Sequence, residues 1–218
     1  MTSTDSKSSG TPDLTIAVLG ATGMVGSRVI TEATARGHQV RALSRKPADE
    51  VPNVTPYAVD ASDTDALREA LAGADAVVIA LRTEPVDQDF LVGATRAVLT
   101  TGIRAVVVGG AGVLRSPGDP ALLVADNSVY VPEEVKPVAA AGVAQLRACE
   151  EDAGHWTYLA PPAQLAPGER TGRYRRGTDT LLTAHDGRSW ISAEDLAVAV
   201  LDELEAPGAD HLITVVHH

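Results

Sequence analysis

The stretch TIAVLGATGMVGSRVI, residues 15–30, decides the fold. An apolar run ends in three glycines spaced three apart, Gly20, Gly23 and Gly26, and apolar residues then recur at helical spacing. A strand that turns through glycines into a helix brings free backbone N–H groups to one point, where a pyrophosphate can approach closely. The stretch therefore predicts a dinucleotide-binding turn; glycines that only shape a turn are the alternative.

The rest of the chain repeats this alternation of strand and helix. Short runs rich in Val and Ile predict strands at 14–20, 38–45, 54–60, 74–81, 103–112, 156–163 and 210–216. Helical patterns lie between them at 24–36, 64–73, 89–102 and 137–152, and a last helix begins after Ser192 as its N-cap. The rhythm predicts an α/β fold, a Rossmann-type doubly wound parallel sheet with a small C-terminal elaboration on the substrate side.

The domain organisation follows from the polar and proline-rich stretches. Residues 1–13 are polar and predict a flexible leader, and residues 14–218 predict a single domain, because no internal repeat or dividing linker interrupts them. Segments 113–136 and 161–192 break the rhythm and are expected to lie on the substrate side, since long loops in compact domains are usually functional. The stretch HDGRS, 185–189, has hairpin-like turn residues.

Composition narrows the classes of partner. The 218 residues carry a formal net charge of −11, which disfavours nucleic acid and anionic membrane as partners. The single cysteine, Cys149, excludes an internal disulfide, and no residue set has metal-ligand spacing, so no metal is expected. No apolar run approaches the roughly 20 residues of a membrane span. We expect a cytoplasmic monomer or homodimer; whether His217 and His218 are native is left open.

The end of the second predicted strand indicates which dinucleotide is bound. An NAD site usually places Asp or Glu there, whereas this chain has Ser44, Arg45 and Lys46. A hydroxyl and two cations suit a 2′-phosphate, so NADP is preferred over NAD, although an exposed basic turn is the alternative. Asp60, at the end of the third strand, is expected to meet the adenine edge by itself or through Ala61.

Six motifs, two of which contain the glycine turn and the end of the second predicted strand, carry a family resemblance. They are GATGMVG (20–26), ALSRKP (42–47), VVVGGAG (106–112), PEEVKP (132–137), LAPPAQLAPGERTGRYRRGTDTLL (159–182) and ISAEDLAVAVLDEL (191–204). With them the chain resembles an atypical short-chain dehydrogenase/reductase, close to the NAD(P)H–flavin reductase group that is related to biliverdin reductase B and NmrA-like proteins. The resemblance runs over residues 14–216. It implies a Rossmann fold with the substrate over the nicotinamide, at the C-terminal ends of the strands.

The resemblance also implies roles for individual residues. It assigns the pyrophosphate to Gly20, Thr22, Gly23, Met24 and Val25, and the 2′-phosphate to Ser44 and Arg45, beside Lys46. Gly26 belongs to the same cofactor-binding turn, where it is expected to let the helix pack close to the strand. It assigns the adenosine and ribose path to Ala80, Leu81 and Arg82, and the nicotinamide ribose to Gly109, Gly110 and Lys136. Pro161, Pro162 and Ala163 would flank the carboxamide.

Two departures from the family pattern affect catalysis. Many of these dehydrogenases use Tyr-x-x-x-Lys, in which the lysine lowers the tyrosine pKa so that the tyrosine donates a proton; the chain has no such motif. Val135 precedes Lys136 where an aromatic residue is usual, and Val113 stands where a serine is usual. Tyr130, six residues before Lys136, is the displaced candidate for the proton donor, so Tyr130 and Lys136 are the candidate catalytic residues.

A cluster of four arginines lies in ERTGRYRRG, residues 169–177. Arg170, Arg173, Arg175 and Arg176 are candidates for gathering an anionic substrate, but a solvated edge is the better interpretation for at least two of them.

These patterns predict an NADP-dependent reductase that acts on a flat, conjugated small molecule such as a flavin, a quinone or an aromatic polyketide. Such an acceptor needs stacking above the nicotinamide more than it needs a strong protein acid. Two alternatives stay open, because a fold does not fix a function. One is a non-redox isomerase, cyclase or dehydratase, and the other is an NmrA-like protein that senses NADP.

Overall fold

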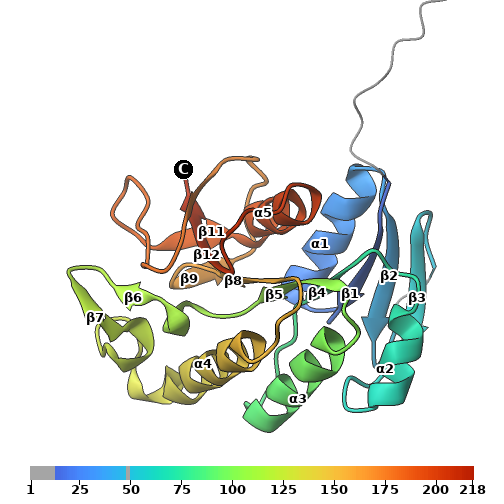
Figure 1. Cartoon of the computed structure of the whole chain (residues 1–218). Coiled ribbons are helices and arrows are strands. Elements are labelled where there is room, and N and C mark those ends of the chain that lie inside the picture. Colours follow the sequence, from blue (N-terminus) through green and yellow to red (C-terminus); the bar gives the residue numbers. More distant parts are fainter. Residues whose placement is uncertain (1–12, 48–49) are drawn as a thin grey trace, which may run out of the picture.

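The seven predicted strands form one eight-stranded sheet, drawn in Figure 1, together with an edge strand, β10, that the sequence analysis did not predict. The computed structural model describes residues 13–47 and 50–218, so the predicted leader lies outside the described residues except for Asp13. The strand order is β10-β12-β8-β5-β4-β1-β2-β3. The bounds are β1 Thr15–Leu19, β2 Gln39–Ser44, β3 Val54–Ala58, β4 Ala76–Ile79, β5 Arg104–Val108, β8 Trp156–Ala160, β10 Tyr174–Gly177 and β12 Leu212–His217. All neighbours pair in parallel except β10 and β12.

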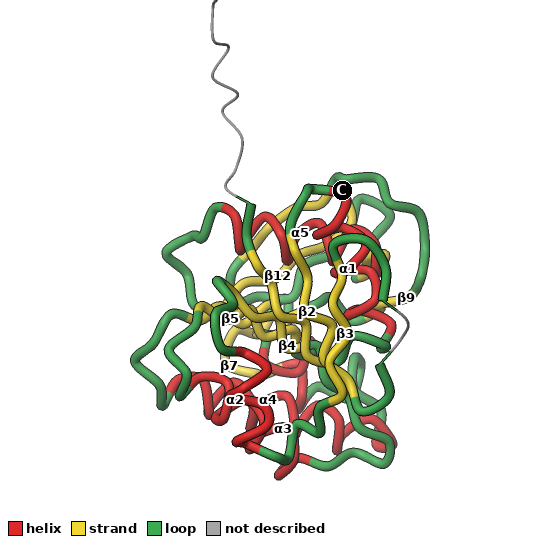
Figure 2. Tube along the Cα trace, turned by 90° about the vertical axis from the view of Figure 1, so that its right-hand side faces the viewer, coloured by secondary structure: helices red, strands yellow, loops and turns green. Residues whose placement is uncertain are grey.

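Helices cover both faces of this sheet, as Figures 1 and 2 show. α1 (Met24–Ala35) and α5 (Ala193–Glu205) lie on one face, and α2 (Thr64–Leu71), α3 (Gln88–Leu99) and α4 (Lys136–Glu150) lie on the other. Strand residues alternate between the two cores: Val18 packs on the side of α1 and α5, and Leu19 packs on the opposite side. The doubly wound Rossmann-type fold predicted from the sequence is confirmed.

Segment 113–136, expected as an irregular loop, contains a small antiparallel hairpin. β6 (Arg115–Ser116) pairs with β7 (Asp119–Leu123) across a turn at Gly118, and single helical turns η1 (Ala111–Val113), η2 (Val124–Asp126) and η3 (Glu133–Val135) flank it. Arg115 N–H donates to the Asp179 carbonyl at 2.7 Å, and the two side chains form an ion pair at 2.9 Å. The hairpin therefore joins the two segments that the sequence places on the substrate side.

A second small sheet follows β8. β9 (Gln164–Ala166) pairs in parallel with β11 (Trp190–Ser192). The HDGRS stretch does turn, with Gly187 at a φ of 81°, but the strands beside it do not form a hairpin, because β11 reaches back to β9 instead. Strands this short leave too few alternating positions for the sequence to reveal them.

Candidate functional site

The glycine turn lies between the carboxyl end of β1 and α1. Gly20 has a φ of 93°, and a Cβ there would lie 2.4 Å from the Ala80 carbonyl oxygen. A Cβ on Gly26 would lie 2.2 Å from the Gly20 carbonyl oxygen. Gly23 differs, because its φ of −75° is ordinary and its Cβ would stay 3.2 Å from Gly20. Backbone packing thus requires glycine at positions 20 and 26. At exposed Gly23 the backbone leaves more room for a side chain.

The amino end of α1 is left without a side-chain cap. Its N-cap residue is Gly23, and its first turn has no acidic residue. The caps of α2, α3 and α5 are side chains of Asp63, Asp87 and Ser192, which accept hydrogen bonds from helical N–H groups. Uncapped N–H groups at the positive end of a helix suit a phosphate. The exposed neighbours Thr22 and Met24 leave this end open to solvent.

The carboxyl end of β2 carries a hydroxyl that lacks a partner. Ser44 is buried, and its Oγ has no hydrogen-bond partner among the described residues. Arg45 and Lys46 follow it and are exposed, and neither forms an ion pair within the described part of the chain. A buried polar atom without a partner is destabilising. A phosphate oxygen would supply that partner, so these residues fit the 2′-phosphate predicted here.

Asp60, assigned to the adenine edge, is engaged locally. Its carboxylate accepts hydrogen bonds from Ser62 N–H at 3.0 Å and from Ser62 Oγ at 2.8 Å. These bonds, with a smaller contribution from the charge of Arg45, lower the pKa of Asp60. Ala61 is buried beside it. The Asp60 carboxylate is exposed and charged, and it lies close enough to Arg45 for the two charges to interact.

The carboxyl end of β4 touches the glycine turn. The Ala80 carbonyl lies against Gly20, and Ala80 and Leu81 are half-buried. Arg82 extends into solvent, with its guanidinium 3.8 Å from the Glu84 carboxylate. The residues assigned to the adenosine path thus lie beside the glycine turn, at the edge where ligands bind in open α/β sheets. A cavity of about 460 Å³, lined by residues 39 and 50–55, lies away from this edge, at the amino ends of β2 and β3.

The glycine pair after β5 packs over a buried tyrosine that the sequence analysis did not single out. A Cβ on Gly109 would lie 1.8 Å from the Tyr158 hydroxyl oxygen, so only glycine fits there. Tyr158 donates a hydrogen bond to the Gly142 carbonyl at 3.1 Å. Complete burial raises the pKa of Tyr158 far above its usual range, although a hydrogen bond with backbone Gly110 opposes the shift. Tyr158 therefore stays protonated and supports Gly109 and Gly110 from behind.

The two candidate catalytic residues are not brought into contact. Tyr130 is half-buried and packs against the core on the α4 side of the sheet. Lys136 begins α4, and its ammonium group lies 2.5 Å from the Glu133 carboxylate on the exposed surface. Val113 is buried, whereas Val135 is exposed. Valine side chains thus occupy the two positions where the family pattern has a serine and an aromatic residue, and neither valine can donate or accept a proton.

Pro161, Pro162 and Ala163 leave the carboxyl end of β8 beside the glycine pair. Gly109 N–H donates to the Leu159 carbonyl at 3.1 Å, which holds the ends of β5 and β8 together. Both prolines are buried, and Ala163 is exposed with its N–H bonded to Ser189 Oγ at 3.2 Å. The residues assigned to the carboxamide therefore neighbour those assigned to the nicotinamide ribose.

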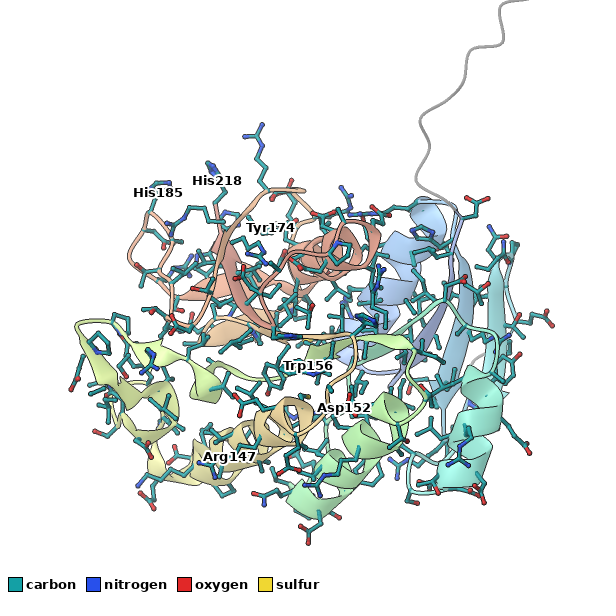
Figure 3. All side chains as sticks on the ribbon, viewed as in Figure 1. Arg147, Asp152, Trp156, Tyr174, His185 and His218 are labelled. Carbon is teal, nitrogen blue, oxygen red and sulfur yellow. The ribbon has the colours of Figure 1, made fainter. Side chains whose placement is uncertain are left out.

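Two of the four clustered arginines are committed to carboxylates of the helices. Arg170 binds Glu32 on α1 through two hydrogen bonds of 2.7 and 2.8 Å. Arg176 binds Glu203 on α5 at 2.6 Å and Asp210 at 2.9 Å. Tyr174, labelled beside α5 in Figure 3, donates to Asp202 at 2.6 Å. Arg170 and Arg176 therefore have structural partners, and the Arg175 guanidinium donates to the Thr183 carbonyl. Within the described residues, this leaves exposed Arg173 as the arginine of the cluster whose side chain forms no hydrogen bond.

Glu32 makes stability depend on pH. The Arg170 hydrogen bonds, helped by Arg36, hold the pKa of this buried carboxyl below its ordinary 4.5. A carboxyl whose folded pKa is lowered stabilises the fold above its unfolded pKa and loses that contribution as pH falls through the folded value. We expect the difference in unfolding free energy between the wild type and Glu32→Gln to be largest near neutral pH and to shrink below about 4.5. Urea titrations across pH measure it, and a constant difference would contradict the assignment.

Two other kinds of site were sought in residues 13–47 and 50–218. These residues contain no group of three or more His, Cys, Asp or Glu side chains placed to hold a metal ion. None of the described helices combines the length and the apolar character that crossing a bilayer requires.

Comparisons with known proteins agree with this geometry. Residues 20–207 match the family model described as NAD(P)H-binding, a range that includes every residue assigned to the cofactor. Three solved structures are similar over 94% of the chain. The "putative exported protein" of Burkholderia pseudomallei is 39% identical over 100% of its chain, with a TM-score of 0.83. The "putative epimerase" of Bacteroides thetaiotaomicron is 33% identical over 98% of its chain, with a TM-score of 0.85. The "putative NADH-flavin reductase" of Streptococcus pneumoniae TIGR4 is 27% identical over 100%, with 0.83.

Proposed function

The chain belongs to the NAD(P)H-binding family, and from this premise we propose that it is an NADP-dependent reductase of flat, conjugated acceptors such as flavins, quinones or aromatic polyketides. The observation that carries the proposal is the amino end of α1, which has no side-chain cap in the part of the chain that the structure describes. It lies with Ser44, whose Oγ has no partner there, and with exposed Arg45 and Lys46. Together they offer N–H donors for a pyrophosphate and a hydroxyl with two cations for a 2′-phosphate.

The chain supplies binding and orientation, and the bound dihydronicotinamide supplies the hydride. The turn from Gly20 to Gly26 would hold the pyrophosphate, and Gly109 and Gly110 would support the nicotinamide ribose. Tyr158 keeps this glycine pair in place, because its ring fills the space that any side chain at Gly109 would need. Pro161 to Ala163 would flank the carboxamide and orient the nicotinamide ring.

The polar groups around the proposed acceptor site support a conjugated acceptor rather than a simple ketone. Tyr158 is fully buried with a raised pKa, so it holds its proton. Tyr130 packs against the core, and Lys136 is paired with Glu133. Reduction of a flavin or quinone spreads the new charge over the ring, so water can supply the proton. The exposed apolar side chains of Val129, Val135 and Val138 suit a flat apolar partner.

A non-redox isomerase is the second candidate, favoured by the 33% identity to the "putative epimerase" of Bacteroides thetaiotaomicron. The two functions differ in their cofactor balance. A reductase consumes one NADPH for each acceptor reduced, whereas an isomerase converts its substrate without net loss of NADPH. Following NADPH absorbance and product together separates them.

Catalysis without a tyrosine acid is tested by Tyr130→Phe. We expect turnover with a quinone at saturating NADPH to change less than about twofold, whereas loss of a true general acid costs roughly 10²–10⁴-fold. Lys136→Ala should act through cofactor affinity, by removing a ribose contact. A collapse of turnover in Tyr130→Phe with unchanged NADPH affinity would show that the tyrosine donates the proton, and proton-transfer chemistry would then be the better assignment.

A further inference from the structure

Residues 163–172, which we call the strap, connect the carboxamide-flanking residues to the two helices on one face of the sheet. The strap is exposed along its length except for half-buried Leu165. An exposed segment has water available for its polar groups, and most such segments have no need of buried partners. Several polar contacts of the strap are nevertheless made with carboxylates, and two of these, Glu32 and Asp195, are buried.

Asp195, in the first turn of α5, has no exposed surface, and every hydrogen bond it accepts from outside the helix comes from the strap among the described residues. Thr171 N–H and Gly172 N–H donate to Oδ1 at 2.9 and 2.8 Å, and Thr171 Oγ1 donates to Oδ2 at 2.6 Å. A buried carboxylate without donors is strongly unfavourable. Asp195 therefore fixes the conformation of the strap as much as the strap satisfies Asp195.

Two more carboxylates, Glu32 and Glu194, connect the strap to α1, the helix that begins at the glycine turn. Arg170 makes its two hydrogen bonds to Glu32, whose side chain is 5% exposed on α1. Gly168 N–H donates to Glu194 Oε2 at 2.7 Å, and Arg28 of α1 binds the other oxygen of Glu194 at 3.0 Å. The strap is thus bound to both α1 and α5.

The two elements joined by these contacts, α1 and the strap, begin at the residues proposed to bind the two halves of the cofactor. α1 begins at the pyrophosphate turn, and the strap begins at Ala163, next to the carboxamide-flanking prolines. We propose that Glu32 and Asp195 are positioning residues that hold the strap in the geometry with which residues 161–163 bind the nicotinamide half of NADP. This inference rests on the proposed function. It means that two buried carboxylates outside the proposed cofactor site contribute to the selectivity for the nicotinamide half of NADP.

The test compares two ligands that share one half. NADP⁺ and 2′-phospho-ADP-ribose both carry the pyrophosphate and the 2′-phosphate, but only NADP⁺ carries the nicotinamide. Calorimetric titration gives the dissociation constant of each with the wild type, Asp195→Asn and a control, Glu203→Gln. Glu203 is also buried on α5 and also binds an arginine, Arg176, but among residues 13–47 and 50–218 it forms no hydrogen bond or ion pair with the strap.

We expect Asp195→Asn to weaken NADP⁺ about tenfold more than 2′-phospho-ADP-ribose, because misplacement of a positioning group is costly. Glu203→Gln should change both affinities alike. If Asp195→Asn fails to fold, Arg170→Gln breaks the Glu32 tie from an exposed position and should shift the same ratio. Equal changes for both ligands in the strap variants would overturn the inference while leaving the proposed function standing. A wild type that binds neither ligand would overturn both.

Discussion

Replacing Gly23 by valine is expected to abolish NADPH binding while the chain still folds. The φ of −75° at this position is accessible to valine, and the new Cβ would come no closer than 3.2 Å to the Gly20 carbonyl oxygen. Loss of glycine at the helix N-cap should cost about 1 kcal/mol of stability. The branched side chain would occupy the space proposed for the pyrophosphate. Fluorescence titration with NADPH, together with thermal unfolding, measures both effects.

Gly26→Ala is the matched control three residues away. Its Cβ would lie 2.2 Å from the backbone oxygen of Gly20, so the turn must shift to admit it. Overpacking of this kind typically costs about 1–3 kcal/mol. We therefore expect Gly26→Ala to lose stability together with affinity, because the shifted turn is the one proposed to hold the pyrophosphate. Gly23→Val should lose affinity with little loss of stability. Normal NADPH affinity in a folded Gly23→Val protein would show that the turn does not hold the pyrophosphate.

Replacing Arg45 by alanine should weaken NADPH by about 10- to 100-fold and leave NADH nearly unchanged. A hydrogen bond to a charged group is worth roughly 1.5–3 kcal/mol, and 1.4 kcal/mol corresponds to a factor of ten. Arg45 is exposed and directly follows β2 and Ser44, whose hydroxyl has no partner among the described residues. Parallel titrations with the two dinucleotides give the ratio directly.

The control for this charge change is Arg147→Ala. Arg147 is an exposed arginine on α4, labelled in Figure 3, on the sheet face opposite α1. Its removal changes the net charge by the same amount without touching the β2 end, so both dinucleotides should bind as in the wild type. Equal losses of NADPH and NADH in Arg45→Ala would mean that Arg45 does not distinguish the 2′-phosphate.

The fold was largely predictable because its signals are local. The glycine turn and the Val-rich strands each reveal themselves within about ten residues, and Ser192 caps α5 as its position suggested. The hairpin β6–β7 was missed because β6 has only two residues. The strands β9, β10 and β11 were missed because they are short and pair with segments that are distant in the sequence. Arg115 meeting Asp179 is a contact that periodicity cannot show.

The supports of the site were also hidden in the sequence. Glu32 and Asp195 look like ordinary solvent-facing helix residues until the strap folds over them. One feature of the sequence could have drawn attention to Tyr158: it is an aromatic residue in a predicted strand of a chain with only 3% aromatic residues. In the fold, its strand pairs with β5, which is followed by the glycine pair. The close approach that makes Gly109 necessary comes from tertiary packing rather than from a turn.

The reductase assignment is tested most directly by NADPH oxidation with a panel of acceptors. Purified protein is mixed with NADPH and, separately, with a flavin, a quinone and an aromatic ketone, and the loss of NADPH absorbance is followed with Gly23→Val as the blank. The account predicts acceptor-dependent oxidation of NADPH by the wild type with the flavin or the quinone, faster than with the ketone, and none in Gly23→Val. NADPH that binds tightly but is not oxidised with any of the three, or a substrate converted without loss of NADPH, would contradict it.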